Sequence, residues 1–196
     1  MSLKGCATGI HHFILEYGIE FFIHSFDSLC MKILVTGNSG AGKTTIAKKL
    51  VDDYSLAHLD LDELAWLPVE PPRRRLVADS LEEIEAYAWQ HFGWVMEGCY
   101  GDLLEAIAPK ATHLIWLNYP VDICIKHAQY RPWEPHKYSS PAAQDKNLQM
   151  LFDWIKSYPL RRDECSQHQH QELFDQFTGQ KITIEHPDEL DQLKLP

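Results

Sequence analysis

Residues 32–45 read Lys-Ile-Leu-Val-Thr-Gly-Asn-Ser-Gly-Ala-Gly-Lys-Thr-Thr. An apolar run ends at Thr36, and the eight residues after it match the pattern G-x-x-x-x-G-K-[ST] in full. The run predicts a buried strand, and apolar residues at helical spacing after the loop predict a helix over 43–53. A strand, a glycine-rich turn and a helix are the context that this motif requires. The sequence therefore predicts a P-loop, which binds the phosphates of a nucleotide.

The predicted loop has a residue for each task in binding ATP. Glycines let the backbone turn so that several N–H groups point inward at phosphate oxygens. Lys43 is expected to reach the β- and γ-phosphates, and Thr44 to place its hydroxyl on Mg²⁺. A glycine-rich turn without a ligand is the alternative, and the strand–loop–helix context disfavours it. The residues predicted to bind ATP are Gly37, Asn38, Ser39, Gly40, Ala41, Gly42, Lys43, Thr44 and Thr45.

Strand and helix patterns alternate from Met31 to the end of the chain. Further strands are predicted over residues 57–61, 93–97, 112–117 and 181–184. Such alternation is typical of a mostly parallel sheet that is covered by helices on both faces. Ligands in these folds bind at the carboxyl ends of the strands. The motifs described here fall at those ends.

Local capping signals predict where two of the helices begin. Ser80 and Glu83 match a capping box, which predicts that a helix starts at Ser80. Ser140 and Pro141 predict the start of another helix, whose core-facing stripe is Leu148, Leu151, Phe152 and Ile155.

Three acidic residues are predicted to lie near the phosphate loop. Asp60 and Asp62 end the second strand, and two residues apart in an extended chain they point to the same side. Acids at this edge can hold metal-bound water or accept a substrate hydroxyl proton, so we expect Asp60 at the metal and Asp62 in catalysis. The alternative is that one caps the next helix and the other is solvated. Glu97 ends the third strand, where a second Mg²⁺ anchor is usual, so the predicted metal set is Thr44, Asp60 and Glu97.

Arginines in later segments are candidates for stabilising a transferred phosphoryl group, which gathers negative charge. Arg131, Arg161 and Arg162 flank a proline-containing stretch over 132–141 and are predicted to be catalytic. We also expect Arg161 and Arg162 to begin the helix before the last strand. The run over 73–75 is more typical of a solvated surface, although its place after two prolines suits one arginine that contacts an acceptor.

From residue 31 to 196 the chain resembles the small P-loop kinases of the adenylate-kinase and shikimate-kinase type. The most discriminating likeness is to the adenylate-kinase-related "DNA topology modulation" group. It is carried by Leu61-Asp62-Glu63-Leu64-Ala65-Trp66-Leu67-Pro68 and by Glu97-Gly98-Cys99-Tyr100, in which Cys99 replaces an asparagine of that pattern.

The resemblance implies a fold and a division of labour along the chain. It implies an α/β P-loop NTPase fold, a three-layer α/β/α sandwich around a five-stranded parallel sheet of order 2-3-1-4-5. Residues 31–196 would form this kinase-like domain, in which 61–92 is the acceptor-binding insert and 131–162 is a lid that closes on ATP. The activity implied is transfer of the γ-phosphoryl group of Mg-ATP to a small molecule.

The motif after the third strand departs from both kinase types. Adenylate kinases have Asp-Gly-Phe-Pro-Arg there, whereas residues 97–101 contain no arginine. Shikimate kinases have a glycine-rich turn there, which is also absent, although the pair Asp60 and Asp62 looks like their arrangement. The acceptor is therefore left open between a nucleoside monophosphate-like compound and a hydroxylated metabolite. An ATP-binding regulatory module with little turnover is the alternative function, and a GTP switch is disfavoured because no Asn-Lys-x-Asp segment occurs.

The composition limits partners and location. A formal net charge of −10 repels polyanions, so direct nucleic-acid binding is not expected. No stretch approaches the roughly 20 apolar residues that a membrane-spanning helix needs. The expected oligomeric state is a monomer or a homodimer. The number of cysteines is odd and they are widely spaced, which fits a reduced, cytoplasmic protein without a zinc site. We interpret His168 and His170 as solvated polar residues. The cysteines are Cys6, Cys30, Cys99, Cys124 and Cys165.

Residues 1–30 form an N-terminal extension that does not fit the pattern of the rest of the chain. Its apolar pieces are broken by charged residues and lack a small-residue cleavage site, so a signal peptide is not predicted. Either Met31 is the natural start and the extension is upstream sequence, or the extension packs on the domain or on a partner.

Overall fold

A computed structural model describes residues 31–69, 71–134 and 139–195 of the chain. The predicted N-terminal extension, residues 1–30, lies outside the described residues. Within them, none of the helices is long and apolar enough to cross a membrane.

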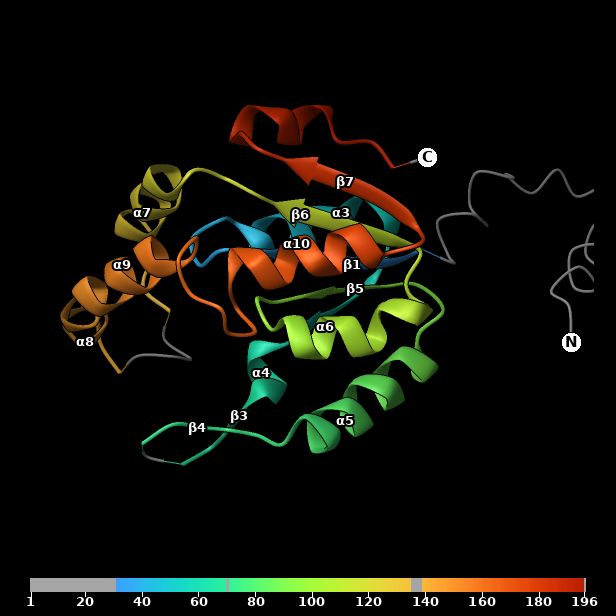
Figure 1. The fold of residues 1–196 in the computed structure, drawn as a ribbon, viewed down its shortest axis with the longest axis horizontal. Helices are drawn as coiled ribbons and strands as arrows, with labels where there is room; N and C mark the ends of the chain where they lie inside the picture. Colours follow the sequence, from blue (N-terminus) through green and yellow to red (C-terminus); the bar gives the residue numbers. More distant parts are fainter. Residues whose placement is uncertain (1–30, 70, 135–138, 196) are drawn as a thin grey trace, which may run out of the picture.

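The centre of the molecule is a five-stranded parallel sheet in the order β2–β5–β1–β6–β7 (Figure 1). The strands are β1 (Lys32–Gly37), β2 (Ala57–Asp60), β5 (Trp94–Glu97), β6 (His113–Leu117) and β7 (Gln180–Ile184). Numbered by themselves in chain order, these five strands have the predicted order 2-3-1-4-5. The labels differ because the chain segment that connects β2 to β5 contains two short strands, β3 (Trp66–Leu67) and β4 (Arg73–Arg74). These two strands form a separate antiparallel hairpin outside the main sheet.

Each face of the sheet carries its own layer of helices. Along β1, Ile33 and Val35 belong to one buried cluster and Leu34 to the other, because successive strand side chains point to opposite faces. The first cluster takes in residues of α3 (Lys43–Tyr54), α7 (Val121–Gln129) and α9 (Leu148–Ser157). The second takes in residues of α4 (Asp62–Ala65), α5 (Val77–Gln90), α6 (Gly101–Ile107) and α10 (Gln167–Gln176). The result is the predicted α/β/α sandwich.

Two segments extend beyond the carboxyl ends of the strands. Figure 1 shows the arrowheads of β6 and β7 pointing toward α7, α8 (Pro141–Lys146) and α9. The β3–β4 hairpin reaches out on the same side of the molecule. The predicted insert and the described part of the predicted lid therefore border the edge of the sheet where ligands bind in such folds. Short 3₁₀ turns at Ala108–Lys110 (η1) and Pro187–Gln192 (η2) complete the described elements.

Three predictions about helix boundaries are wrong. Helix α5 begins at Val77, so Ser80 is not its cap; its hydroxyl donates instead to the Leu64 carbonyl, 2.7 Å away, and ties α5 to α4. The single helix predicted from Ser140 is two helices, α8 and α9, which break at Asn147. Ser140 caps the first of them as predicted, by accepting a bond from the Ala143 N–H.

The third error concerns the predicted arginine-led helix. Arg161 and Arg162 lie in the turn between α9 and α10, and α10 begins only at Gln167. Ser166 caps α10 by accepting a hydrogen bond from the Gln169 N–H at 3.2 Å. The helix therefore begins after a serine whose side-chain oxygen can accept a backbone hydrogen bond. The two arginines on which the prediction was based do not mark this boundary.

Candidate functional site

The P-loop connects the buried strand β1 to α3, as predicted. Gly40 and Gly42 have φ values of 76° and 86°, a region that side chains with a Cβ rarely adopt. A Cβ on Gly40 would lie 2.3 Å from the Cys124 carbonyl oxygen, so the loop packs tightly against α7. A Cβ on Gly42 would meet nothing within 4 Å. The loop therefore borders open space at Gly42, just before the first turn of α3, whose N–H groups lack partners within the helix.

Lys43 lies folded onto its own loop. Its ammonium donates to the carbonyl oxygens of Gly37 at 3.3 Å and Asn38 at 3.1 Å. These contacts satisfy the ammonium and keep it beside the loop opening. The role of Lys43 at the phosphates stays a prediction.

Two contacts that hold the loop were not identified from the sequence. His127 of α7 has its Nδ1 3.0 Å from the Gly40 carbonyl oxygen. Asn38 is fully buried and donates through Nδ2 to the Ile155 carbonyl at 3.0 Å, which links the loop to α9. The loop is thus hydrogen-bonded to α7, which precedes the predicted lid, and to α9, which lies within it. Neither contact follows from a sequence pattern, because each joins segments far apart in the chain.

Two of the three predicted metal residues contact each other directly. The Thr44 hydroxyl donates to Glu97 Oε1 at 2.6 Å, and Glu97 is 2% exposed. Asp60 is paired with Glu97 in the register of β2 and β5, so it lies at the same sheet edge. Its Oδ1 accepts a hydrogen bond from the Asp62 N–H at 2.9 Å. The strand ends at Asp60 and Asp62 begins α4, so the prediction that both acids end the strand and point to one side of an extended chain is wrong. His58 Nε2 lies 3.8 Å from Glu97 Oε1.

This donor set fits a hard cation such as Mg²⁺. Mg²⁺ prefers oxygen ligands and keeps several waters, so one hydroxyl and one or two carboxylates suffice beside substrate phosphates. Over the described ranges, no cluster of three or more histidine, cysteine or acidic side chains has the geometry to hold a metal alone. An ion bound by Thr44, Glu97 and Asp60 would therefore depend on the nucleotide for further ligands.

Asp62 begins α4 and is held by an aromatic pair. The Tyr100 hydroxyl donates to Asp62 Oδ1 at 2.6 Å, and Trp66 Nε1 donates to the Tyr100 oxygen at 2.7 Å. Burial raises the pKa of Tyr100, and the negative charge of Asp62 adds to this effect. The hydroxyl therefore stays protonated and remains a donor to the carboxylate. Tyr100 was noted only as part of a motif, and its link to Asp62 requires the folded structure.

Arg74 is the member of the arginine run that enters this site. Its guanidinium lies 4.6 Å from the Tyr100 ring centre and 5.7 Å from that of Trp66. It also forms an ion pair with Asp102 at 2.8 Å and lies 3.5 Å from a carboxylate oxygen of Glu164. By contrast, Arg73 is exposed, and Arg75 pairs with Glu83 on α5. One of the three arginines is therefore built into the site, and it is held by two acids.

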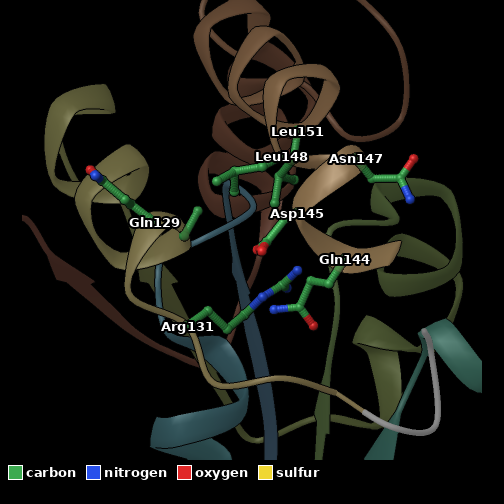
Figure 2. Close-up of a pocket in the computed structure, with 8 residues that line it drawn as sticks. Gln129, Arg131, Gln144, Asp145, Asn147, Leu148 and Leu151 are labelled. Atoms are coloured by element: carbon green, nitrogen blue, oxygen red, sulfur yellow. The ribbon is translucent and has the colours of Figure 1, made fainter. Parts of the chain in front are cut away.

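The predicted catalytic arginines lie at different places in the described lid. Arg131 pairs with Glu134 at 3.1 Å and extends toward Gln144 and Asp145 in a pocket between α7, α8 and α9 (Figure 2). The enclosed space is about 20 Å³, room for about one water molecule, so it is not a nucleotide pocket in this conformation.

Arg161 is fixed to its own segment. Its guanidinium stacks 3.6 Å from the Trp154 ring centre and donates to the Trp154 carbonyl at 2.9 Å. It also donates to the Cys165 carbonyl and lies 3.1 Å from a carboxylate oxygen of Asp163. Arg162, its neighbour, is exposed. The structure thus gives Arg161 a clear packing role, and the predicted catalytic role of both arginines stays a prediction.

His170 is not the solvated residue that the sequence suggested. It is fully buried, with Nδ1 2.8 Å from the Tyr158 hydroxyl and Nε2 2.8 Å from the Cys99 carbonyl oxygen. Burial lowers the pKa of His170 to about 4, so the ring is neutral at ordinary pH. Its position supports the 98–100 loop that carries Tyr100. His168, two residues earlier, is exposed as expected.

The loop, the sheet order and the two helix layers define a P-loop α/β protein. No protein-family model matches the chain. In sequence it is 23% identical over 154 residues to the shikimate kinase of Staphylococcus epidermidis, a match that spans 71% of this chain and 85% of that protein. The crystal structure of shikimate kinase from Bacteroides thetaiotaomicron matches the fold with a TM-score of 0.50. Its sequence identity is 17%, over 83% of this chain and 93% of that one. The sequence similarity supports a small-molecule kinase, and the structural similarity supports the P-loop α/β fold.

Proposed function

We propose that this protein is an ATP-dependent phosphotransferase that moves the γ-phosphoryl group of Mg-ATP to a hydroxyl group of a small metabolite. The observation that carries the proposal is the 2.6 Å bond between Thr44 and Glu97 at the mouth of the P-loop. It joins the hydroxyl of the phosphate motif to a buried acid at the end of the neighbouring strand. Asp62, which accepts a hydrogen bond from the Tyr100 hydroxyl, lies at the start of α4, the helix that follows β2.

The roles of the residues follow from their placement. The loop over 37–45 and the first turn of α3 would bind the phosphates, with Lys43 moving from the loop carbonyls to the β- and γ-phosphates. Thr44, Glu97 and Asp60 would hold Mg²⁺, which neutralises charge on the transferred group. Asp62 would orient the acceptor hydroxyl and take its proton. Arg131, Arg161 and Arg162 are the proposed sources of further positive charge.

The charges around Asp62 favour a hydroxylated acceptor over a nucleoside monophosphate. A phosphate acceptor needs arginines that can turn to it, as bidentate Arg–phosphate pairs do. Arg74, the arginine nearest Tyr100, is instead engaged by Asp102 and Glu164. A hydroxylated ring that carries no phosphate group would bind beside Trp66 and Tyr100 without drawing Arg74 from these ion pairs. The sequence similarity to a shikimate kinase supports the same class of acceptor.

The test is a panel of acceptors offered to the full chain with Mg-ATP. Shikimate, a hydroxylated carboxylic acid, and uncharged cyclic polyols represent hydroxylated acceptors, and the nucleoside monophosphates represent phosphate acceptors. Release of ADP and the mass of the product are measured for each compound. A phosphorylated polyol is the expected product, and a product formed only from a nucleoside monophosphate would contradict the acceptor assignment. Tight ATP binding without any product would favour the ATP-binding regulatory module instead.

The remaining expectations belong to the same proposal. A cytoplasmic enzyme that acts on a small molecule fits a net charge of −10, which disfavours nucleic acid as a partner. Membership of the "DNA topology modulation" group rests on the strings at 61–68 and 97–100. That membership would not by itself identify the acceptor. A monomer or homodimer is the proposed state, to be measured by light scattering.

A further inference from the structure

Two thiols from distant parts of the chain lie against each other beside the candidate site. The sulfur atoms of Cys99 and Cys165 are 2.9 Å apart, and the residues are separated by 66 positions in the sequence. Cys99 belongs to the loop between β5 and α6, and Cys165 to the turn before α10. A disulfide bond requires a separation of about 2.05 Å, so a small rotation of the side chains would close the gap.

The backbone around the thiols is already locked in this close approach. The Gly101 N–H donates to the Glu164 carbonyl at 2.7 Å, and His170 contacts the Cys99 carbonyl oxygen at 2.8 Å. A Cβ on Gly101 would lie 2.4 Å from the Gln169 side chain, so the glycine permits this approach. The two segments therefore need no rearrangement before a covalent link can form.

The thiols differ in their access to solvent. Cys99 is partly exposed, whereas Cys165 is 4% exposed. We therefore expect a small oxidant to reach Cys99 before Cys165, and the Cys165 thiol, 2.9 Å away, is placed to react with the product. The third free cysteine among the described residues, Cys124, is buried in the other core cluster and has no cysteine partner there.

We propose that Cys99 and Cys165 are a peroxide-responsive pair that forms a reversible disulfide. The Cys99 sulfur attacks a peroxide oxygen, the O–O bond breaks, and a sulfenic acid and one water form when the oxidant is hydrogen peroxide. The Cys165 sulfur then attacks the sulfenic sulfur and releases a second water. Two thiols and one hydrogen peroxide thus give one disulfide and two waters. A thiol reductant reverses the link, and this inference does not depend on the kinase proposal.

The link would lie next to the candidate metal and acceptor residues. Cys99 is placed between Glu97, which binds Thr44, and Tyr100, which holds Asp62. A bond from Cys99 to the α9–α10 turn therefore fixes the loop that follows Glu97 and carries Tyr100. Oxidation would act on the site through the position of this loop.

The first experiment maps the cross-link in the full chain. The reduced protein is treated with hydrogen peroxide, its free thiols are alkylated, and the digest is read by mass spectrometry. The expected result is a linked pair of peptides containing Cys99 and Cys165, two hydrogens lighter than the free pair and cleaved by dithiothreitol. The midpoint of thermal unfolding should rise by several degrees on oxidation, because the link closes a long loop. Links formed only by Cys6, Cys30 or Cys124, or Cys99 oxidised to sulfinic acid without a link, would overturn the inference.

The second experiment removes the resolving thiol. In Cys165→Ser the sulfenic acid at Cys99 cannot be resolved, so a dimedone adduct should accumulate there severalfold above the wild-type level after brief peroxide treatment. Cys124→Ser is the matched control and should keep both the cross-link and the rise in unfolding temperature. Equal dimedone labelling of Cys99 in the wild type and in Cys165→Ser would contradict the proposed pairing. If Cys165→Ser does not fold, the peptide map of the wild-type chain still decides the question.

Discussion

Thr44 donates its hydroxyl hydrogen to Glu97 Oε1 across 2.6 Å, and this bond joins the first turn of α3 to the carboxyl end of β5. A hydroxyl that donates to a carboxylate still has lone pairs to offer a cation. Glu97 is 2% exposed, so its charge is costly to bury without compensation. A divalent cation would supply that compensation. The pair is therefore the part of the structure that argues most directly for metal-dependent chemistry.

The variant Glu97→Gln tests this metal role. Glutamine keeps an oxygen that can accept the Thr44 hydrogen bond, so the fold should survive, but the negative charge is lost. We expect the concentration of Mg²⁺ needed for half-maximal turnover to rise by roughly 10- to 100-fold. Turnover measured over a Mg²⁺ series, with a thermal melt of each protein, gives the comparison.

The control for this variant is Glu85→Gln. Glu85 is an exposed acid that pairs with Lys110 at 2.7 Å, away from the loop. The variant Glu85→Gln should leave the Mg²⁺ dependence unchanged, because exposed ion pairs contribute little to stability. The same Mg²⁺ dependence in Glu97→Gln and the wild type would rule out Glu97 as a metal ligand.

The variant Lys43→Ala tests the phosphate loop itself. In the structure the ammonium rests on the carbonyl oxygens of Gly37 and Asn38, and the nucleotide would draw it to the phosphates. We expect turnover to fall by about 10²- to 10³-fold, as when one preorganised charge-stabilising group is removed. Lys48→Ala, an exposed position on the same helix, should behave as the wild type. Both are assayed with Mg-ATP and the acceptor found in the panel, and equal turnover in the two variants would contradict the P-loop assignment.

The variant Tyr100→Phe tests whether the tyrosine positions Asp62. A hydrogen bond to a charged group contributes about 1.5–3 kcal/mol, so its loss should lower turnover by roughly 10- to 100-fold. Binding of ATP, measured by calorimetry, should not change, because Tyr100 contacts the acceptor side of the site. Tyr87→Phe is the matched control: it removes a hydroxyl that donates to the His58 carbonyl at 2.7 Å and does not contact Asp62. A similar loss of turnover in both variants would show that general destabilisation, not positioning, is the cause.

The local sequence predicted the five strands because each is a short apolar run bounded by a turn or a cap, whereas their order was implied by the resemblance to small P-loop kinases. The P-loop and the positions of Asp60 and Glu97 were predictable for the same reason, since parallel strands bring their carboxyl ends to one edge. The error at Ser80 has a physical cause. Its hydroxyl finds a partner in the Leu64 carbonyl of another helix, and a tertiary contact overrides the local capping signal.

The parts that could not be predicted are contacts between distant segments. Trp66, Tyr100 and Asp62 form one hydrogen-bonded chain only because α4 and the 98–100 loop meet in the fold. His170 looked solvated because its neighbours in sequence are polar, yet one face of α10 packs on the sheet and buries it. Arg74 was indistinguishable from its two neighbours in sequence, and only its direction in the hairpin brings it to the aromatic pair.

Buried His170 predicts a loss of stability in mild acid. Its pKa falls from 6.5 to about 4, chiefly through burial, with the charges of Lys43 and Arg161 adding to the effect. Between these values the unfolded chain binds a proton that the folded chain does not, so stability is complete above pH 6.5 and decreases as the pH falls toward 4. The shift corresponds to about 3 kcal/mol at 1.36 kcal/mol per pKa unit. Urea unfolding at a series of pH values measures this slope.

Variants of the two histidines on α10 isolate the effect. His170→Gln lowers stability at neutral pH but should flatten the slope between pH 6.5 and 4. His168→Gln replaces an exposed ring on the same helix and should keep the wild-type slope. A lowered pKa at His113, also caused by burial, remains in both variants and contributes equally. An unchanged slope in His170→Gln would show that other groups control the acid response.

Variants of Arg161 and Arg162 distinguish a packing role from a catalytic role in the predicted lid. Arg161 stacks on Trp154 at 3.6 Å and bonds two backbone carbonyls, so Arg161→Ala should lower stability by roughly 2 kcal/mol and the unfolding midpoint by several degrees. Arg162 is exposed, so Arg162→Ala should leave the unfolding midpoint unchanged and lower turnover only if its side chain reaches the transferred phosphoryl group. Arg161→Lys keeps the positive charge but lacks the planar fork that makes the stack and the carbonyl bonds. Near-normal turnover with reduced stability in Arg161→Lys would therefore assign Arg161 to packing, whereas reduced turnover with normal stability would assign it to phosphoryl transfer.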